Sequence, residues 1–168
     1  MVVTKNLHKE YQRIDGKLYE TLIITDDDGK QVQRIDIPLK VELKVHDILE
    51  VLVGASILAV PTAFTEEVWN MGGQLPWFNI MMLSLVSLLF IASFMYFATY
   101  RLHMKMFKNE FYKRVLFTFL LSIIVVGVLL TIVDKCPWFT DFDVALKRVL
   151  IGAFPASLSA TVTDNISS

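Results

Sequence analysis

A run of 24 residues without a charge, WFNIMMLSLVSLLFIASFMYFATY at Trp77–Tyr100, decides the fold class. A second uncharged run covers the 19 residues Val115–Val133. About 20 apolar residues are needed to cross a bilayer, and both runs are long for a buried helix of a soluble protein. Trp77 at one end, and Tyr96 and Tyr100 at the other, match the aromatic belts of membrane interfaces. We therefore predict an all-α membrane fold.

Two further uncharged segments resemble each other: VLVGASILAVPTAFT at Val51–Thr65 and VLIGAFPASLSATVT at Val149–Thr163. Each has 15 residues, holds one proline and runs into an acidic residue. Short segments interrupted by Gly or Pro in corresponding positions indicate a transporter's binding site. We expect Pro61 and Pro155 to interrupt these two short spans. The likeness favours either an internal duplication or chance recurrence in a biased composition. The predicted spans are 48–66, 77–100, 114–134 and 144–164.

The N-terminal part is polar and is predicted to form a small β-rich segment, which divides the chain into domains 1–47 and 48–168. Leu18–Thr25 and Gln31–Ile37 are rich in β-branched residues or alternate, and Asp28-Gly29 between them is typical of a hairpin turn. The alternation around Val41–Val45 predicts a further strand or an extended lead-in.

Charge in the loops predicts the orientation. Residues 101–114 carry six Arg, Lys or His side chains against one Glu, whereas 66–79 contain no Lys or Arg. Basic loops remain in the cytoplasm, so both termini of a four-span chain are predicted to be cytoplasmic, and the 66–79 loop lies outside.

Glu66 and Glu67, with the hydroxyls of Thr62 and Thr65, form a candidate outer cation site, because hard cations take carboxylate and hydroxyl oxygens. Two alternatives stay open. The carboxylates could form structural ion pairs with Lys147 and Arg148, or they could be a solvated helix end. Glu50 is either a favourable negative charge in a first helical turn or a member of a structural ion pair with Lys147 and Arg148.

Ser157, Thr161 and Asp164 share one face of the fourth span by their spacing. This stripe lines a hydrated pathway or makes hydrogen bonds between helices. Two rows of small residues predict that the first and fourth spans pack closely, within or between subunits. The rows are Ala55, Ala59 and Ala63, and Gly152, Ala156 and Ala160. Four helices leave little room for a pathway, so we expect a homo-oligomer.

Several classes of function lack their sequence signals. We find no nucleotide-binding loop, nucleophile motif or pair of histidines with metal-ligand spacing, so we expect neither an enzyme nor a bound cofactor. Cys136 is the single cysteine. The net charge of −1 gives no evidence for a nucleic-acid partner, and we expect none. The expected partners are the lipid bilayer, further copies of the chain and inorganic cations. The identity of any metal ion stays open.

The stretch VPTAFTEEVWN at Val60–Asn70, followed by Pro76-Trp77-Phe78, resembles a family of uncharacterised prokaryotic integral membrane proteins. Its signature has Pro, three residues, then Thr-Glu-Glu-x-Trp, and it covers the first span and its outer loop, about a fifth of the chain. The resemblance implies a multi-pass protein of the prokaryotic inner membrane. It carries no activity.

Taken together, these patterns predict an oligomeric cation channel or cation-coupled transporter with an acidic outer site. The alternative is a non-transporting scaffold or sensor module whose N-terminal segment binds a partner.

Overall fold

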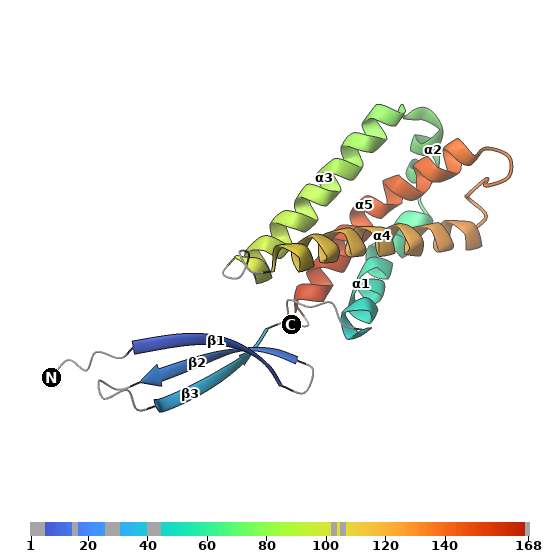
Figure 1. Cartoon of the computed structure of the whole chain (residues 1–168). Helices are drawn as coiled ribbons and strands as arrows, with labels where there is room; N and C mark the ends of the chain where they lie inside the picture. The colour runs from blue at the N-terminus through green and yellow to red at the C-terminus, as the bar shows by residue number, and fades with distance from the viewer. Residues whose placement is uncertain are drawn as a thin grey trace. The chain divides into compact units, whose positions relative to one another are not determined.

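The computed structural model describes residues 6–14, 17–25, 31–39, 45–101, 104 and 107–166 (Figure 1). Contacts divide the chain into two compact units, Met1–Glu42 and Leu43–Ser168. The first unit is a small sheet and the second is helical. We describe each unit by itself.

The first unit is a three-stranded antiparallel sheet in the order β1-β2-β3. Its strands are β1 (Asn6–Ile14), β2 (Lys17–Thr25) and β3 (Gln31–Pro38). The predicted hairpin is confirmed as the β2–β3 pair, whereas the turn predicted at Asp28-Gly29 lies outside the described residues. The strand predicted near Val41–Val45 also falls largely outside them, and Val45 already belongs to a helix.

Strand β1 was not predicted, because its sequence NLHKEYQRI is mostly polar and charged. It pairs with β2 along its full length, and Lys9 Nζ lies 2.9 Å from Glu20 Oε1. This carboxylate raises the pKa of Lys9 above its ordinary value. On the other strand pair, the hydroxyl of Thr21 donates to Asp36 at 2.7 Å and, with Arg34, lowers the pKa of Asp36. Cross-strand polar pairs therefore connect all three strands.

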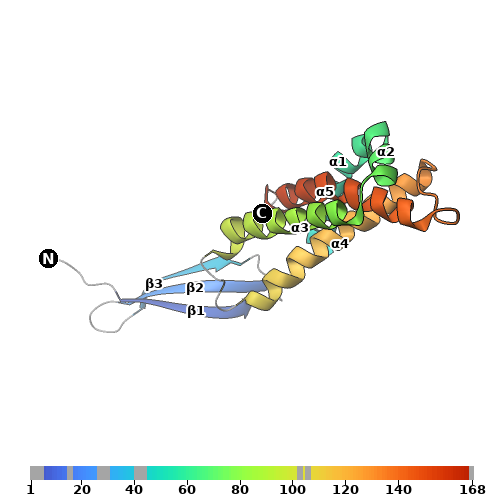
Figure 2. The same ribbon diagram turned by 90° about the horizontal axis from the view of Figure 1, so that it is seen from above.

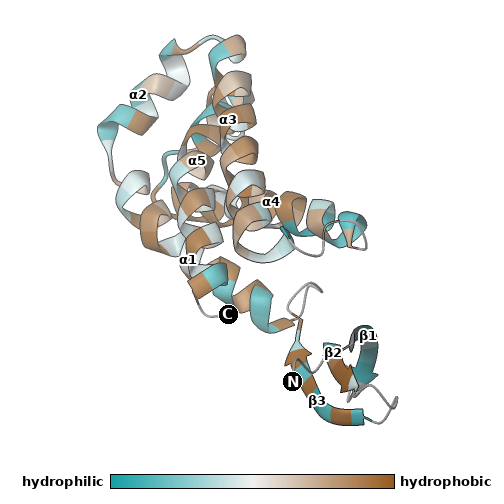
Figure 3. Cartoon of the chain, turned by 90° about the vertical axis from the view of Figure 1, so that its left-hand side faces the viewer, coloured by the Kyte–Doolittle hydropathy of each residue, from teal (hydrophilic) through white to brown (hydrophobic). Residues whose placement is uncertain are grey.

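Within the described residues, the second unit contains five α-helices and one π-helical turn. They are α1 (Val45–Ala63), α2 (Glu66–Gln74), α3 (Trp77–Met95), η1 (Tyr96–Tyr100), α4 (Lys108–Ile132) and α5 (Phe142–Ile166). Within the described residues, four helical segments are long and apolar enough to cross a membrane: Val45–Ala63, Trp77–Tyr100, Lys108–Ile132 and Phe142–Ile166. Figure 3 shows the apolar residues along these helices.

Helix α5 is the centre of the bundle, because it packs against α1, α2, α3 and α4 (Figure 2). More than half of its apolar window, 56%, is buried, against 22–33% for the other three spans. The remaining surfaces of α1, α3 and α4 expose large apolar side chains, as a lipid-facing surface requires. The described core thus forms around the last helix of the chain.

The two prolines lie inside continuous helices, so the expected interruption of spans one and four is wrong. Pro61 falls in the last turn of α1 and has no N–H to donate to the carbonyl of Ile57, whereas Thr62 Oγ1 donates to the carbonyl oxygens of Leu58 and Ala59. Pro155 lies in the middle of α5, which runs for 25 residues. The fourth span is therefore not short. Neighbouring helices and hydroxyl side chains commonly accommodate proline in membrane helices.

The small-residue rows do bring α1 and α5 together, and this pair has the most extensive contact of all the helices. Ala55, Ala59 and Ala63 are at most 1% exposed. At Gly54 an added Cβ would lie 2.7 Å from the side chain of Thr163 and 2.9 Å from Ala160 Cα, so the backbones approach closely there. Gly152 instead faces Val126 of α4, so the second row serves two helices.

Candidate functional site

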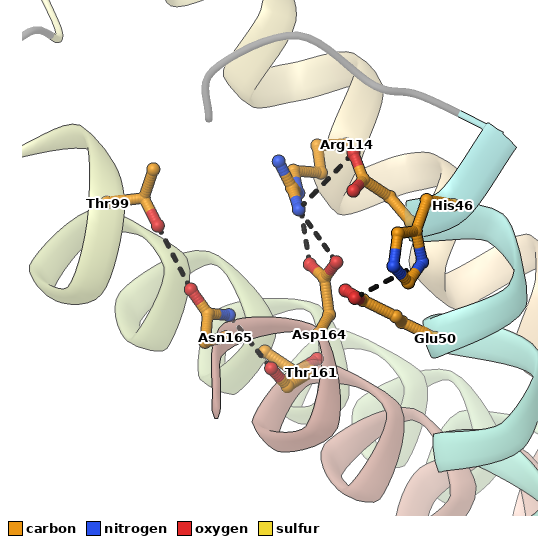
Figure 4. Close-up of polar contacts among 8 residues, drawn as sticks. His46, Glu50, Thr99, Arg114, Thr161, Asp164 and Asn165 are labelled. Atoms are coloured by element: carbon orange, nitrogen blue, oxygen red, sulfur yellow. Dashed lines mark hydrogen bonds and ion pairs between the residues drawn. The ribbon is translucent and has the colours of Figure 1, made fainter. Parts of the chain in front are cut away.

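Charged side chains from three helices meet at one end of the bundle (Figure 4). Asp47 and Glu50 lie near the start of α1, Arg114 near the start of α4, and Asp164 near the end of α5. Successive spans run in opposite directions, which brings these two starts and one end to the same side. By the loop charges, this is the predicted cytoplasmic end.

Arg114 and Asp164 form a bidentate pair inside the protein. Arg114 Nε donates to Asp164 Oδ2 at 3.0 Å, and Nη2 donates to Oδ1 at 2.7 Å. Their side chains are only 5% and 0% exposed. Asp47 Oδ2 lies 3.7 Å from the same Nη2, which makes the guanidinium a link between the first, third and fourth spans. The buried side chain of Tyr100, from η1, also interacts with Arg114.

Glu50 lies beside this pair but takes no part in it. Its Oε1 is 3.4 Å from His46 Nδ1, and its side chain is 9% exposed. Its Oε2 is buried and has no hydrogen-bond partner among the described residues. One carboxylate oxygen each from Asp47, Glu50 and Asp164 lie within 4.8 Å of one another. The end of the bundle therefore collects three buried carboxylates around one guanidinium.

The rest of the polar face of α5 is used in hydrogen bonds between or within helices. The hydroxyls of Ser157 and Ser87 are 2.6 Å apart across the α3–α5 contact, and Thr161 donates to the Ser157 carbonyl at 2.7 Å. Thr99 donates to Asn165 at 3.0 Å, which connects η1 to the end of α5. Of the two interpretations of this stripe, these contacts favour interhelical bonding.

The remaining candidate residues lie at the opposite end of the bundle, which is the predicted outer end. Glu66 and Glu67 occupy the first turn of α2 and are exposed, and within the described residues neither forms an ion pair or hydrogen bond. Thr65 donates to the Thr62 carbonyl at 2.8 Å. The outer cation site at Thr62, Thr65, Glu66 and Glu67 stays a prediction.

The alternative in which these glutamates pair with Lys147 or Arg148 is not seen among the described residues. Lys147 pairs with Asp143, one turn earlier on α5, at 2.7 Å. Arg148 donates to the backbone carbonyls of Trp69 at 2.9 Å and Lys135 at 2.6 Å. Its side chain lies against Gly72 of α2, where an added Cβ would overlap Arg148 Cγ. This path takes the guanidinium past α2 to backbone acceptors.

Glu50 is also separate from Lys147 and Arg148. Asp164, its neighbour, is 17 positions beyond Lys147 on α5, which corresponds to about 25 Å of helix. The described partner of Glu50 is His46 on its own helix.

Sequence reasoning missed Arg114 and Asp47. Arg114 was counted with the loop charges that set orientation, because the third span was expected to begin there, but α4 begins at Lys108. Asp47 preceded the expected first span, whereas α1 begins at Val45. The signal that could have found them is that both residues lie close to an apolar run. Ionisable residues within a turn or two of a span must find partners or water.

These features define a class: a polytopic α-helical integral membrane protein with four candidate spans and a small N-terminal sheet. The chain matches the family described as "Putative integral membrane protein (DUF2391)" over residues 18–164, and it belongs to that family. The match begins in β2 and ends at Asp164, so it takes in much of the sheet as well as the helices. The predicted kind of family is confirmed, while the Pro61–Trp69 signature stays a prediction. No curated protein and no solved structure matches the chain.

Proposed function

We propose that this chain is a non-enzymatic membrane module of the sensor or scaffold kind, in which the charged cluster sets how α1, α4 and α5 are held and the N-terminal segment binds a partner. The observation that carries this proposal is the bidentate Arg114–Asp164 pair with Asp47 beside it. A buried ion pair adds less net stability than apolar packing, and its best-attested use is to specify one arrangement of helices over another.

The packing of the bundle supports a module over a pore through one chain. Ala59, Ala156 and Ala160 fill the α1–α5 contact and are fully buried. The hydroxyls that would line a pathway along α5 already bond to Ser87 or to helix carbonyls. A wet pathway along α5 would have to break these contacts.

The chain connection supports a link from the cluster to the N-terminal segment. Asp47 and Glu50 lie in the first two turns of α1, and the sheet precedes that helix in the chain. A change in the position of the start of α1 therefore acts directly on the residues that join it to β3.

A cation channel or cation-coupled transporter formed by several copies is the second candidate. Exposed Glu66 and Glu67 favour it, because two unpaired carboxylates beside an apolar span attract cations. Both proposals place the protein in a prokaryotic cell membrane with its termini in the cytoplasm.

Flux into liposomes separates the two candidates. Purified protein is reconstituted and tested with a panel of monovalent and divalent cations, alongside the Glu66→Gln, Glu67→Gln double variant. For the module, flux equals that of protein-free liposomes with every cation. Flux that rises with protein content and falls in the double variant would overturn the module and support transport.

A spin label in the N-terminal segment tests the module directly. The label is placed at Val32→Cys, which is 58% exposed, with the buried Cys136 replaced by Ala. Arg114→Lys keeps the charge but loses the two-pronged bond, so it should change the mobility of the label. The control is Lys113→Gln, whose side chain is 67% exposed. Identical label spectra in all variants would contradict the proposal.

A further inference from the structure

The charges at the predicted cytoplasmic end do not balance among the described residues. Asp47, Glu50 and Asp164 contribute three negative charges and Arg114 one positive charge, so the cluster carries −2 with His46 counted as neutral. All three carboxylates belong to buried or nearly buried side chains. Buried carboxylates are costly unless positive groups lie beside them, so a cluster of three carboxylates favours a bound positive group.

Glu50 indicates where that group binds. Its Oε2 is buried without a hydrogen-bond partner among the described residues, although the rest of the cluster is well bonded. An orphaned carboxylate oxygen costs free energy unless a ligand completes it. In Figure 4 the Glu50 carboxylate points toward Asp164 and lies on the other side of it from Thr99. The buried, unbonded oxygen of Glu50 is therefore evidence for a ligand that does not depend on the number of acidic residues.

We propose that Asp47, Glu50 and Asp164 bind one hard divalent cation of the Ca²⁺, Mg²⁺ and Mn²⁺ class. The ligand set consists of carboxylate oxygens, which these cations prefer, and contains no soft sulfur ligand. A charge of +2 would neutralise the cluster. This proposal rests on the sensor function proposed above, and the cation is the signal that the sensor detects.

The spacing of the oxygens fits such an ion. Ligands on opposite sides of Ca²⁺ are separated by roughly twice the 2.3–2.6 Å bond length, or about 4.6–5.2 Å. The three oxygens already lie within 4.8 Å of one another. Mg²⁺ has shorter bonds of about 2.0–2.1 Å, so oxygens on opposite sides of it are no more than about 4.2 Å apart.

Arg114 is compatible with the ion. Asp164 accepts two hydrogen bonds from the guanidinium, and a carboxylate has about four lone-pair sites, so it can also bind a cation. Arg114 then fixes the orientation of Asp164, and the cation binds a lone pair of this carboxylate that the guanidinium does not occupy. Such support of a ligand by a fixed hydrogen-bonding group is usual in metal sites.

Binding is tested on the purified full chain after treatment with a chelator. Mn²⁺ is titrated and the free ion is measured by its paramagnetic resonance signal, and Ca²⁺ and Mg²⁺ are then added as competitors. We expect one Mn²⁺ per chain, displaced by at least one of the other two ions. Thermal unfolding should shift upward as each bound cation approaches saturation.

The decisive variant is Glu50→Gln, because Glu50 lies outside the Arg114 pair and its loss leaves that pair intact. The affinity for Mn²⁺ should fall on the order of tenfold or more, since affinity follows the ligand charge. In chelator the variant should unfold at the same or a higher temperature than the natural chain, because it removes an uncompensated charge. The control is the Glu66→Gln, Glu67→Gln variant, which removes two exposed carboxylates and should bind Mn²⁺ normally.

Two results would overturn the site. One is a natural chain that binds no divalent cation, which would mean that a proton or another cationic group neutralises the cluster. The other is Mn²⁺ affinity that is unchanged in Glu50→Gln or lost in the Glu66/Glu67 variant. Neither result depends on flux or on label mobility, so the cation site and the sensor function can fail separately.

Discussion

The two ends of the helical unit handle buried charge in opposite ways. At the predicted cytoplasmic end the buried groups are mostly anions, gathered around Arg114. At the predicted outer end the partly buried groups are cations: Arg148 bonds two backbone carbonyls, and Lys135 lies 4.2 Å from the ring centroid of Trp69. The carboxylates of that end, on Glu66 and Glu67, are exposed.

We interpret this difference as a division between charged groups that hold the helices together and charged groups that can bind a ligand. At the predicted outer end, neutral carbonyls bond the guanidinium of Arg148, and aromatic rings lie beside the lysines, so these cations need no further ion. The bonds of Arg148 also connect α2 and the 133–141 segment to α5. Carboxylates packed together around a single arginine retain a net negative charge. We therefore expect the predicted outer end to act as a structural junction and the predicted cytoplasmic end to be the place where a ligand changes the balance of charge.

Asp164→Asn should have the largest effect, because it leaves the Arg114 guanidinium buried without its main anionic partner. We expect a loss of about 3–5 kcal/mol in the free energy of unfolding, as for other broken buried pairs. The measurement is unfolding in detergent, followed by circular dichroism. The matched control is Asp143→Asn, the same change on the same helix, where the carboxylate is 51% exposed and pairs with Lys147.

Asp143→Asn should leave stability nearly unchanged, because water screens that pair. An equal loss in the free energy of unfolding of Asp164→Asn and Asp143→Asn would contradict the difference proposed between the two ends of the bundle. A stable Asp164→Asn chain would show that Arg114 reaches water.

Arg148→Gln should have an intermediate effect. It removes the donor for the carbonyls of Trp69 and Lys135, but both groups lie near the interface where water can replace part of the bonding. We expect a loss of about 1–3 kcal/mol, measured by the same unfolding assay. Faster proteolysis in the 133–141 connection should accompany it. A loss as large as that of Asp164→Asn would contradict the view that carbonyl acceptors hold the outer arginine.

The smallest effect is expected for Glu66→Gln with Glu67→Gln. Both side chains are exposed and have no partner in the part of the chain that the structure describes, so stability should change by no more than about 0.5 kcal/mol. The unfolding assay of the two previous predictions measures this as well. A clear loss would indicate that these carboxylates have a structural partner, for example in a neighbouring copy of the chain.

Composition was enough to predict the membrane fold and its spans. The uncharged run Trp77–Tyr100 and all of Val115–Val133 except its last residue lie within helices that qualify as spans, and the alanine rows lie in the α1–α5 contact. These predictions succeeded because length and small-residue spacing act locally along one helix. Strand β1 was missed for the converse reason, since its stability comes from pairing with β2 rather than from its own apolar pattern.

The candidate site was predicted only in part. Asp164 was identified from its place on a polar helical face, but its partner Arg114 is 50 residues away in the chain. No spacing rule connects residues on different helices, because their contact depends on packing and on where each helix begins. The adjacent pair Glu66 and Glu67 gave the strongest local signal and yet forms no described contact. A dense local cluster of charge thus says less about a site than single charges near the ends of several spans.

The position of Arg114 has a consequence for synthesis of the chain. Arg114 enters the membrane with the third span, and Asp164 is translated 50 residues later. At ribosomal rates of about 5–20 residues per second, the arginine waits roughly 3–10 s for this partner. Asp47 arrives earlier and lies 3.7 Å from Arg114 in the finished fold. The first span can therefore shield the arginine while the fourth is still inside the ribosome, which orders the insertion of the helices.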